Sequence, residues 1–200
     1  MAEHPDLQVI SGRLERGEID SAQYLDQLMR HVAMQIGCSR AGLRLFIDTE
    51  RGRTLRCVAM FDSSLDRIVS AAEILHAPDS PYLEQLQRAG NVTATRAPDD
   101  PVNNGALGEY LAAAKVTALM DMSFSVNGVL FGTFSCEQLG TPVDWTQRQL
   151  QVLRKIASRA SLTLMHVLSM AVDTAPGALW ETSTPNRLAT MPMPLDPTKS

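Results

Sequence analysis

The sequence has few cysteines, no cluster of one charge sign and no long uninterrupted apolar run. Cys38, Cys57 and Cys136 are far apart and include no CxxC pair, which argues against a disulfide framework and a structural zinc site. Eighteen Lys and Arg against 22 Asp and Glu give a net charge of −4, so no nucleic-acid-binding surface is expected. The longest apolar-rich stretch, residues 157–172, is interrupted by an arginine and a histidine, which argues against a membrane span.

Signals for catalysis and export are also missing. No G-x-S-x-G, P-loop or H-E-x-x-H motif occurs, and the four histidines stand apart in the sequence. Residues 1–6 lack the cationic and apolar segments of a signal peptide. We therefore expect a cytoplasmic protein that binds no metal and is not an enzyme.

The length of 200 residues suits one domain with an appendage. We expect a lead-in segment over residues 1–18, a domain over 19–172 and a flexible tail over 173–200, where five of the eleven prolines lie among Thr and Ser. The order of elements predicts an α+β fold around a mostly antiparallel sheet. Apolar periodicity predicts helices over 21–36, 63–75, 81–90, 108–114 and 145–172, and strands over 42–48, 53–61, 92–95, 118–126 and 129–137.

Four local features sharpen these predictions. Asn127-Gly128 is typical of a two-residue hairpin turn, and Asp144 is expected to cap the last helix. Simple alternation places Phe61 on the same side of its strand as Leu55, Cys57 and Ala59. Gly132 lies in mid-strand, where a missing side chain allows a bulge or a close backbone approach.

The second half of the chain resembles a GAF domain. Residues 118–164 read ALMDMSFSVNGVLFGTFSCEQLGTPVDWTQRQLQVLRKIASRASLTL, which is similar to the family's C-terminal half. Upstream, Asp100-Pro101 followed by Glu109-Tyr110-Leu111 resembles the preceding segment in GAF domains of bacterial two-component sensors. The resemblance covers residues 20–172. It implies a GAF-like, PAS-related α+β fold with a central antiparallel sheet of about five to six strands, terminal helices on one face, and loops and short helices over a pocket on the other.

The resemblance implies a pocket with apolar walls and few polar points. Asp121 lies within an apolar strand and needs a partner, because burial of an unpaired carboxylate is costly. The residues that would line this pocket could instead fill a collapsed core, which would leave a dimerising scaffold without a ligand. The candidate ligand-binding residues are Phe61, Tyr82, Tyr110, Asp121, Met122 and Phe124.

The known GAF cofactors are disfavoured by departures from the family's motifs. Cyclic-nucleotide GAF domains carry Asn-Lys, Phe and an acidic stretch where this chain has Glu137-Gln138, Trp145 and Gln149. Bilin-binding GAF domains attach the pigment through a Cys, often beside a His, and no Cys-His pair occurs here. Haem would need a histidine in the pocket, and His76 is expected at a solvent-exposed helix end instead. We therefore expect no identifiable cofactor.

One GAF branch reduces free methionine sulfoxide with cysteines in the loops over the pocket. Residues 62–116 contain no cysteine, and Cys57 and Cys136 lie in strands. In the family's strand order the first strand separates them by roughly 9–10 Å, beyond the Cα separation of about 7 Å that a disulfide allows. A thiol-dependent reductase remains the less favoured alternative.

The last helix carries apolar residues at alternating spacings of three and four, typical of a coiled-coil seam. This stripe either packs on the first helix of the same chain or forms a homodimer, as GAF sensors commonly do. We expect a sensory or regulatory protein that signals through a helical dimer to an unidentified partner in trans. The stripe consists of Leu150, Leu153, Ala157, Ala160, Leu164 and Val167.

Overall fold

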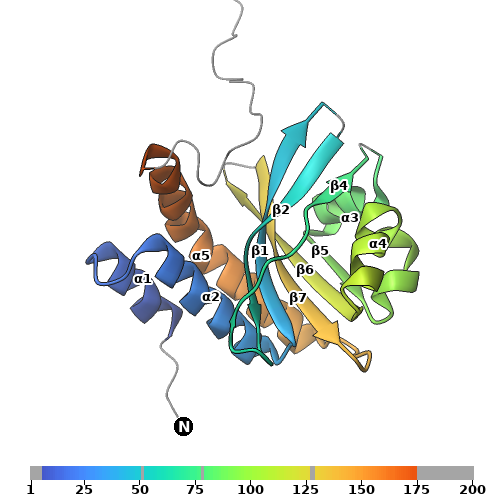
Figure 1. Ribbon diagram of the computed structural model, residues 1–200, viewed down its shortest axis with the longest axis horizontal. Coiled ribbons are helices and arrows are strands. Elements are labelled where there is room, and N and C mark those ends of the chain that lie inside the picture. The colour runs from blue at the N-terminus through green and yellow to red at the C-terminus, as the bar shows by residue number, and fades with distance from the viewer. Residues whose placement is uncertain (1–5, 51, 78, 127–128, 175–200) are drawn as a thin grey trace, which may run out of the picture.

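The computed structural model describes residues 6–50, 52–77, 79–126 and 129–174. Within these residues, seven strands form one antiparallel sheet in the order β3-β2-β1-β7-β6-β5, with β4 paired to β2 (Figure 1). This confirms the predicted α+β fold around an antiparallel sheet. The strands are β1 Arg40–Thr49, β2 Gly52–Asp62, β3 Arg67–Ile68, β4 Ile74–His76, β5 Asn91–Ala94, β6 Val116–Val126 and β7 Val129–Leu139.

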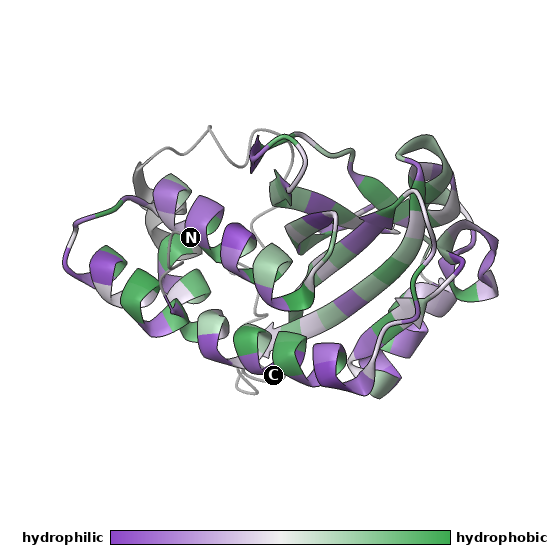
Figure 2. Cartoon of the chain, turned by 90° about the horizontal axis from the view of Figure 1, so that it is seen from below, coloured by the Kyte–Doolittle hydropathy of each residue, from purple (hydrophilic) through white to green (hydrophobic). Residues whose placement is uncertain are grey.

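Helices cover both faces of the sheet. α1 (Leu7–Glu15), α2 (Ser21–Ile36) and α5 (Gln147–Thr174) pack on one face, which we call the helical face. Their apolar and polar residues alternate along each helix (Figure 2), and the apolar ones join the main core. α3 (Pro81–Ala89), α4 (Ala106–Ala113), β4 and two 3₁₀ turns (Ala97–Asp99 and Pro101–Asn103) cover the other face, which we call the covered face.

The chain ahead of residue 19 is part of this packing. Leu7 and Ile10 of α1 are buried in the main core, and α1 contacts both α2 and α5. The segment expected as a lead-in therefore includes a helix that extends the helical layer. The predicted tail over 173–200 lies almost wholly outside the described residues, as does the Asn127-Gly128 turn.

The start of α2 confirms the prediction, and the start of α5 corrects it. Asp20 and Gln23 form a reciprocal capping box, and α2 ends at Gly37 with a φ of 73°. At α5 the Thr146 hydroxyl accepts from the backbone N–H of Gln149 at 3.2 Å. Asp144 instead accepts a hydrogen bond from Thr95, because it lies too far ahead of the first helical turn.

The predicted helix over residues 63–75 is wrong. This segment forms β3 and leads into β4, which takes its hydrogen bonds from the edge of β2. Leu65 and Ile68 in this segment are 52% and 37% exposed. Ile74 is buried beneath the covered face, so pairing with the sheet prevails over the helical period of the sequence.

A bulge in β2 reverses the faces expected from simple alternation. Leu43 pairs with Ala59 and Arg44 with Cys57, so Val58 has no partner in the register. Leu55 consequently lies in the core of the covered face, whereas Ala59 and Phe61 lie in the core of the helical face. The prediction that these side chains share one side is wrong for this reason.

The close approach predicted at Gly132 is confirmed. A Cβ atom built there would lie 2.2 Å from the carbonyl oxygen of Arg44 on the neighbouring strand. Among the described residues, no helix is long and apolar enough to cross a membrane.

Candidate functional site

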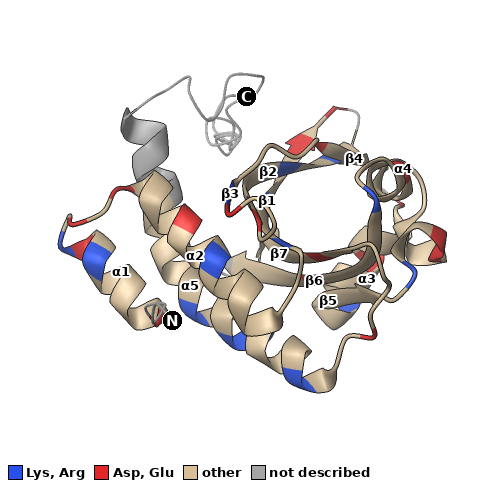
Figure 3. Cartoon of the chain, turned by 60° about the horizontal axis from the view of Figure 1, so that its bottom comes forward, with Lys and Arg blue, Asp and Glu red and all other residues tan. Residues whose placement is uncertain are grey.

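Six ionisable or hydroxyl-bearing side chains gather between the sheet and its cover of β4, α3 and α4. Five of them are at most 2% exposed, and Tyr110 is half-buried. Three come from strands at the centre of the sheet, where both signs of charge occur (Figure 3). We call this set the polar cluster: Arg44, His76, Tyr82, Tyr110, Asp121 and Glu137.

Strand alternation places the charged members on the covered face. Met120 and Met122 pack in the core of the helical face, so Asp121 between them projects the opposite way. The same holds for Glu137, which follows the helical-face residue Cys136, and for Arg44 between Leu43 and Leu45. The apolar side of each strand thus fixes where its charged residue points.

Asp121 has the partner that its burial requires. The Tyr82 hydroxyl donates a hydrogen bond of 2.5 Å to its Oδ2 atom. Burial raises the pKa of Asp121 to about 6, although the hydroxyls of Ser135 and Tyr82 and the charge of Arg44 act in the opposite direction. Burial beside this carboxylate also raises the pKa of Tyr82. The partner that Asp121 was expected to need is therefore a tyrosine hydroxyl.

Arg44 and Glu137 form a buried ion pair. Nη2 of Arg44 lies 3.4 Å from Oε1 of Glu137, which also accepts a hydrogen bond of 2.8 Å from the Tyr110 hydroxyl. The guanidinium lies over the Tyr110 ring and donates to the carbonyl of Ala72 at 3.0 Å. Burial opposes the arginine cation, but Tyr110 and Glu137 outweigh it, so the pKa of Arg44 is raised.

His76 is buried, which overturns the expected solvent-exposed helix end. It lies in β4, stacks on Tyr82 with ring centroids 4.7 Å apart, and places Nδ1 3.1 Å from the Ser80 hydroxyl. Burial and the charge of Arg44 lower its pKa to about 4, so the ring is neutral at pH 7.

The cluster contains polar atoms without partners. Oε2 of Glu137 and Nε2 of His76 are buried and have no hydrogen-bond partner among the described residues. Such groups lose the hydrogen bonds of water without replacing them, which costs about 1–3 kcal/mol each. The same holds for Oδ1 of Asp121, and all three atoms could bond to a molecule that enters this layer.

The six predicted pocket residues do not share one site. Tyr82, Tyr110 and Asp121 belong to the polar cluster. Met122 and Phe124 lie one and three residues after Asp121, so strand alternation places both on the opposite side from Asp121, in the helical-face core. Because of the bulge in β2, Phe61 also packs in the helical-face core, where its ring lies beneath the guanidinium of Arg30.

Sequence reasoning missed Arg44 as a site residue and discounted His76. The available signal was a charged residue at the alternating position of an apolar strand, the same signal that singled out Asp121. For His76 no such signal existed, because the short strand β4 is defined only by its pairing with β2.

The cysteines lie on different faces of the sheet. Cys57 pairs with Arg44, and Cys136 pairs with Ala41 in the core of the helical face, with β1 between their strands as predicted. Burial raises the pKa of both thiols. Thiolate formation, which thiol chemistry requires, is therefore disfavoured at both positions.

The apolar stripe of α5 packs within its own chain, the first of the two arrangements considered above. Leu150 is half-buried, and the five other residues are at most 3% exposed. They contribute to the core shared with the sheet, α1 and α2. In this conformation these five residues offer no free apolar surface to a partner. They are Leu153, Ala157, Ala160, Leu164 and Val167.

Comparison with known proteins identifies the family. The GAF domain model matches residues 20–164. The chain belongs to the GAF family. A comparison with proteins of curated function gave no significant match.

Several solved structures share this GAF fold. A phycocyanobilin-bound GAF domain from a cyanobacterial phytochrome is 15% identical, with a TM-score of 0.59, over 84% of this chain and 94% of that one. A far-red absorbing dark state with bound biliverdin is 14% identical, with a TM-score of 0.62, over 81% and 98%. A domain of a two-component sensor histidine kinase protein from Sinorhizobium meliloti is 17% identical, with a TM-score of 0.53, over 74% and 93%.

These structures correct the expectation about cofactors. We expected no identifiable cofactor and disfavoured a bilin because the chain has no Cys-His pair. Two of the similar structures hold bilins on this fold, so that departure from the motif is not a sufficient reason to set the class aside.

Proposed function

We propose that this GAF domain is a sensory module that binds a small molecule at the polar cluster and catalyses no reaction. The observation that carries the proposal is the set of three buried partnerless atoms in the cluster, Oε2 of Glu137, Nε2 of His76 and Oδ1 of Asp121, beside the buried cation of Arg44. A linear tetrapyrrole is the first ligand to test, because the similar structures include bilin-bound proteins.

The residues of the cluster have distinct roles in this proposal. Glu137 and Asp121 accept hydrogen bonds from N–H groups of the ligand, and Arg44 binds its carboxylates. His76 supplies a neutral ring that donates or accepts through Nε2. A bound bilin would supply visible-light absorption, whereas the chain supplies binding and orientation.

Ligand entry is coupled to movement of the cover. Apolar residues of α3 and α4, including Leu86 and Leu111, pack against the covered face beside the polar cluster. A ligand must displace part of this packing, and it stabilises the displaced state only by its greater affinity for that state. Because α5 packs along β6, the strand of Asp121, the displacement has a path to the last helix.

The output of the module is part of the same proposal. We place it in the cytoplasm as a homodimer that acts on a partner in trans, using exposed surfaces of the terminal helices because the α5 stripe is buried. Light scattering on the full chain during size-exclusion chromatography measures the oligomeric state. A dimeric mass supports this part of the proposal, and a monomeric mass at all concentrations overturns it.

The ligand is tested by reconstitution of the full chain. Purified protein is incubated separately with phycocyanobilin and biliverdin, and native mass spectra and absorption spectra are recorded. Bound pigment mass with a shifted visible band is the expected result. Glu137→Gln is expected to reduce occupancy several-fold, because a buried charge-assisted hydrogen bond becomes a neutral one.

Glu109→Gln is the matched control, since Glu109 is an exposed carboxylate on α4, the helix of Tyr110. It is expected to bind as the unsubstituted protein does. Equal occupancy of the two variants would show that the ligand does not bind at the polar cluster. Absence of any bound mass, both in reconstitution and in protein taken directly from cells, would favour a scaffold whose covered face is filled by its own side chains.

A further inference from the structure

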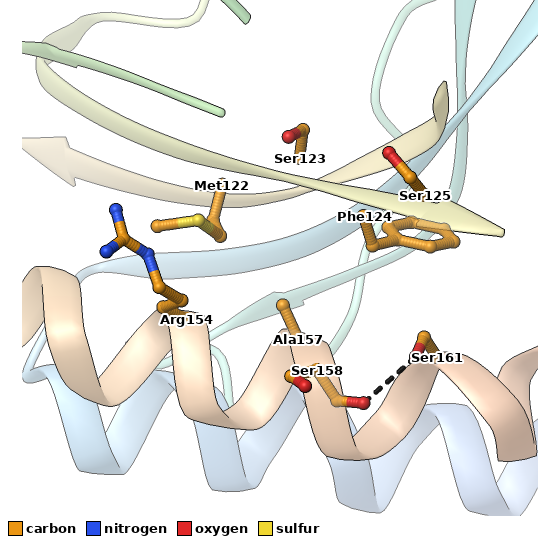
Figure 4. A pocket seen from close by; sticks show the side chains of 8 residues that line it. All are labelled: Met122, Ser123, Phe124, Ser125, Arg154, Ala157, Ser158 and Ser161. Carbon is orange, nitrogen blue, oxygen red and sulfur yellow. Dashed lines mark hydrogen bonds between the residues drawn. The ribbon is translucent and has the colours of Figure 1, made fainter. Parts of the chain in front are cut away.

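A cavity lies on the opposite face of the sheet from the polar cluster. It has a volume of about 230 Å³ and lies between β6 and α5 (Figure 4). The cavity lies beyond the first residue of β5, because this short strand of four residues pairs with β6 only as far as Met122. Beyond that point β6 runs above α5 without a neighbour on its outer side in the described sheet.

The inner wall of this cavity is apolar. Met122 and Phe124 extend from β6 toward α5, and Ala157 points back toward them from the helix (Figure 4). All three are at most 4% exposed. The small side chain of Ala157 leaves the space that a larger residue would fill. An apolar cavity of about 150 Å³ holds benzene, so this volume admits an aromatic ring with one polar substituent.

The mouth of the cavity is polar and cationic. Arg154 extends from α5 toward Met122, and it forms no ion pair within the described part of the chain. The hydroxyls of Ser123 and Ser161 already donate to backbone carbonyls of Gly90 and Ser158. The hydroxyl of Ser158 makes no hydrogen bond to another described residue and is available as a donor, whereas the side chain of Ser125 points away from α5 (Figure 4).

The charge around the cavity has one sign. None of its lining residues is acidic. From Gln147 to Val167, α5 carries four basic residues and no acidic one. An anion at the mouth would therefore meet a guanidinium and the Ser158 hydroxyl with no carboxylate opposing it.

We infer that this cavity binds a small amphipathic carboxylate, with its apolar body against Met122, Phe124 and Ala157 and its carboxylate at Arg154. The ligand would bridge the sheet and the last helix, so its binding would stabilise one position of α5. This site is separate from the polar cluster and does not depend on the function proposed there.

The probe is benzoate, titrated into the full isotope-labelled chain at constant ionic strength and followed by NMR. Saturable shifts at the methyl groups of Met122 and Ala157 and at the ring of Phe124 are the expected result. Arg154→Gln is expected to weaken benzoate binding about tenfold, which corresponds to the loss of one charge-assisted hydrogen bond. Benzyl alcohol, which keeps the ring and lacks the charge, is expected to bind more weakly than benzoate.

Arg159→Gln is the matched control. It removes an equal charge from an exposed position of the same helix that does not line the cavity. It is expected to change the affinity less than twofold, and thermal unfolding of both variants verifies that each is folded. If both substitutions weaken benzoate binding equally, the binding reflects general charge attraction and the proposed site is overturned. Chemical shifts that do not saturate, or that occur at other residues, would overturn it as well.

Discussion

The hydroxyl of Tyr82 on α3 donates a hydrogen bond of 2.5 Å to the carboxylate of Asp121 on β6. Both groups are buried, and the bond joins the cover of the covered face to the sheet. Its strength depends on the protonation of Asp121, because an ionised acceptor forms a stronger hydrogen bond than a neutral one. A ligand that competes for this carboxylate would weaken the attachment of α3.

Tyr82→Phe should therefore destabilise the protein in a pH-dependent way. The substitution removes the donor and leaves a buried carboxylate, so we expect the free energy of unfolding to fall by about 2 kcal/mol at pH 8. At pH 5 the carboxyl is mostly protonated and the loss should be smaller. Urea unfolding at both pH values measures the difference. In an Asp121→Asn background, Tyr82→Phe should cost the same at both pH values, and a pH-independent loss in the unsubstituted background would contradict the account.

The pH dependence of stability should contain two opposing contributions from the polar cluster. The pKa of His76 is lowered from 6.5 to about 4, so its contribution is complete above about pH 6.5 and is lost as the pH falls toward 4. The pKa of Asp121 is raised from 3.8 to about 6, so its contribution is complete below about pH 3.8 and is lost as the pH rises through 6. Between pH 4 and 6 the two slopes largely cancel.

Asp121→Asn should separate these contributions. Relative to the unsubstituted protein, we expect the variant to gain about 2–3 kcal/mol of stability between pH 4 and pH 7, since one pKa unit corresponds to about 1.4 kcal/mol. Urea unfolding across this range gives the difference curve, in which groups common to both proteins cancel. A difference curve without slope would show that Asp121 has an ordinary pKa in the folded protein.

Removal of one partner from the buried ion pair should cost more than removal of both. Arg44→Met leaves the Glu137 carboxyl buried without its cation, so we expect a loss of about 3–5 kcal/mol in the free energy of unfolding. The double variant Arg44→Met with Glu137→Gln should recover most of this loss, because Gln still accepts from Tyr110 and carries no charge. Chemical unfolding of the two single variants and the double variant measures the coupling. Additive losses would contradict an energetic link between the two side chains.

Gly132→Ala should disrupt the pairing of β1 and β7. The added Cβ would lie 2.2 Å from the carbonyl oxygen of Arg44, a backbone atom that cannot move without the strand, so we expect a loss of several kcal/mol. Gly12→Ala in α1 is the matched control, because its new Cβ meets only the flexible end of Arg16. It should stabilise the protein by about 0.5–1 kcal/mol. Thermal unfolding compares them, and similar small effects would contradict the close approach.

The sequence by itself determined the elements whose signals are local. The period of apolar residues located α2, and alternation located the long strands. The residues of 118–164 indicated the family, because turn, glycine and helix-start positions recur there at fixed spacings. Each of these signals arises from residues within a few positions of one another.

Tertiary structure alone decided the composition of the candidate site. The bulge at Val58 turned Phe61 to the helical face, and pairing with β2 converted a predicted helix into the strand that buries His76. Arg44 meets Glu137 across 93 positions of sequence because β1 and β7 are neighbours in the sheet. The energies that select these arrangements come from strand pairing and burial between distant segments, so no local window of the sequence contains them.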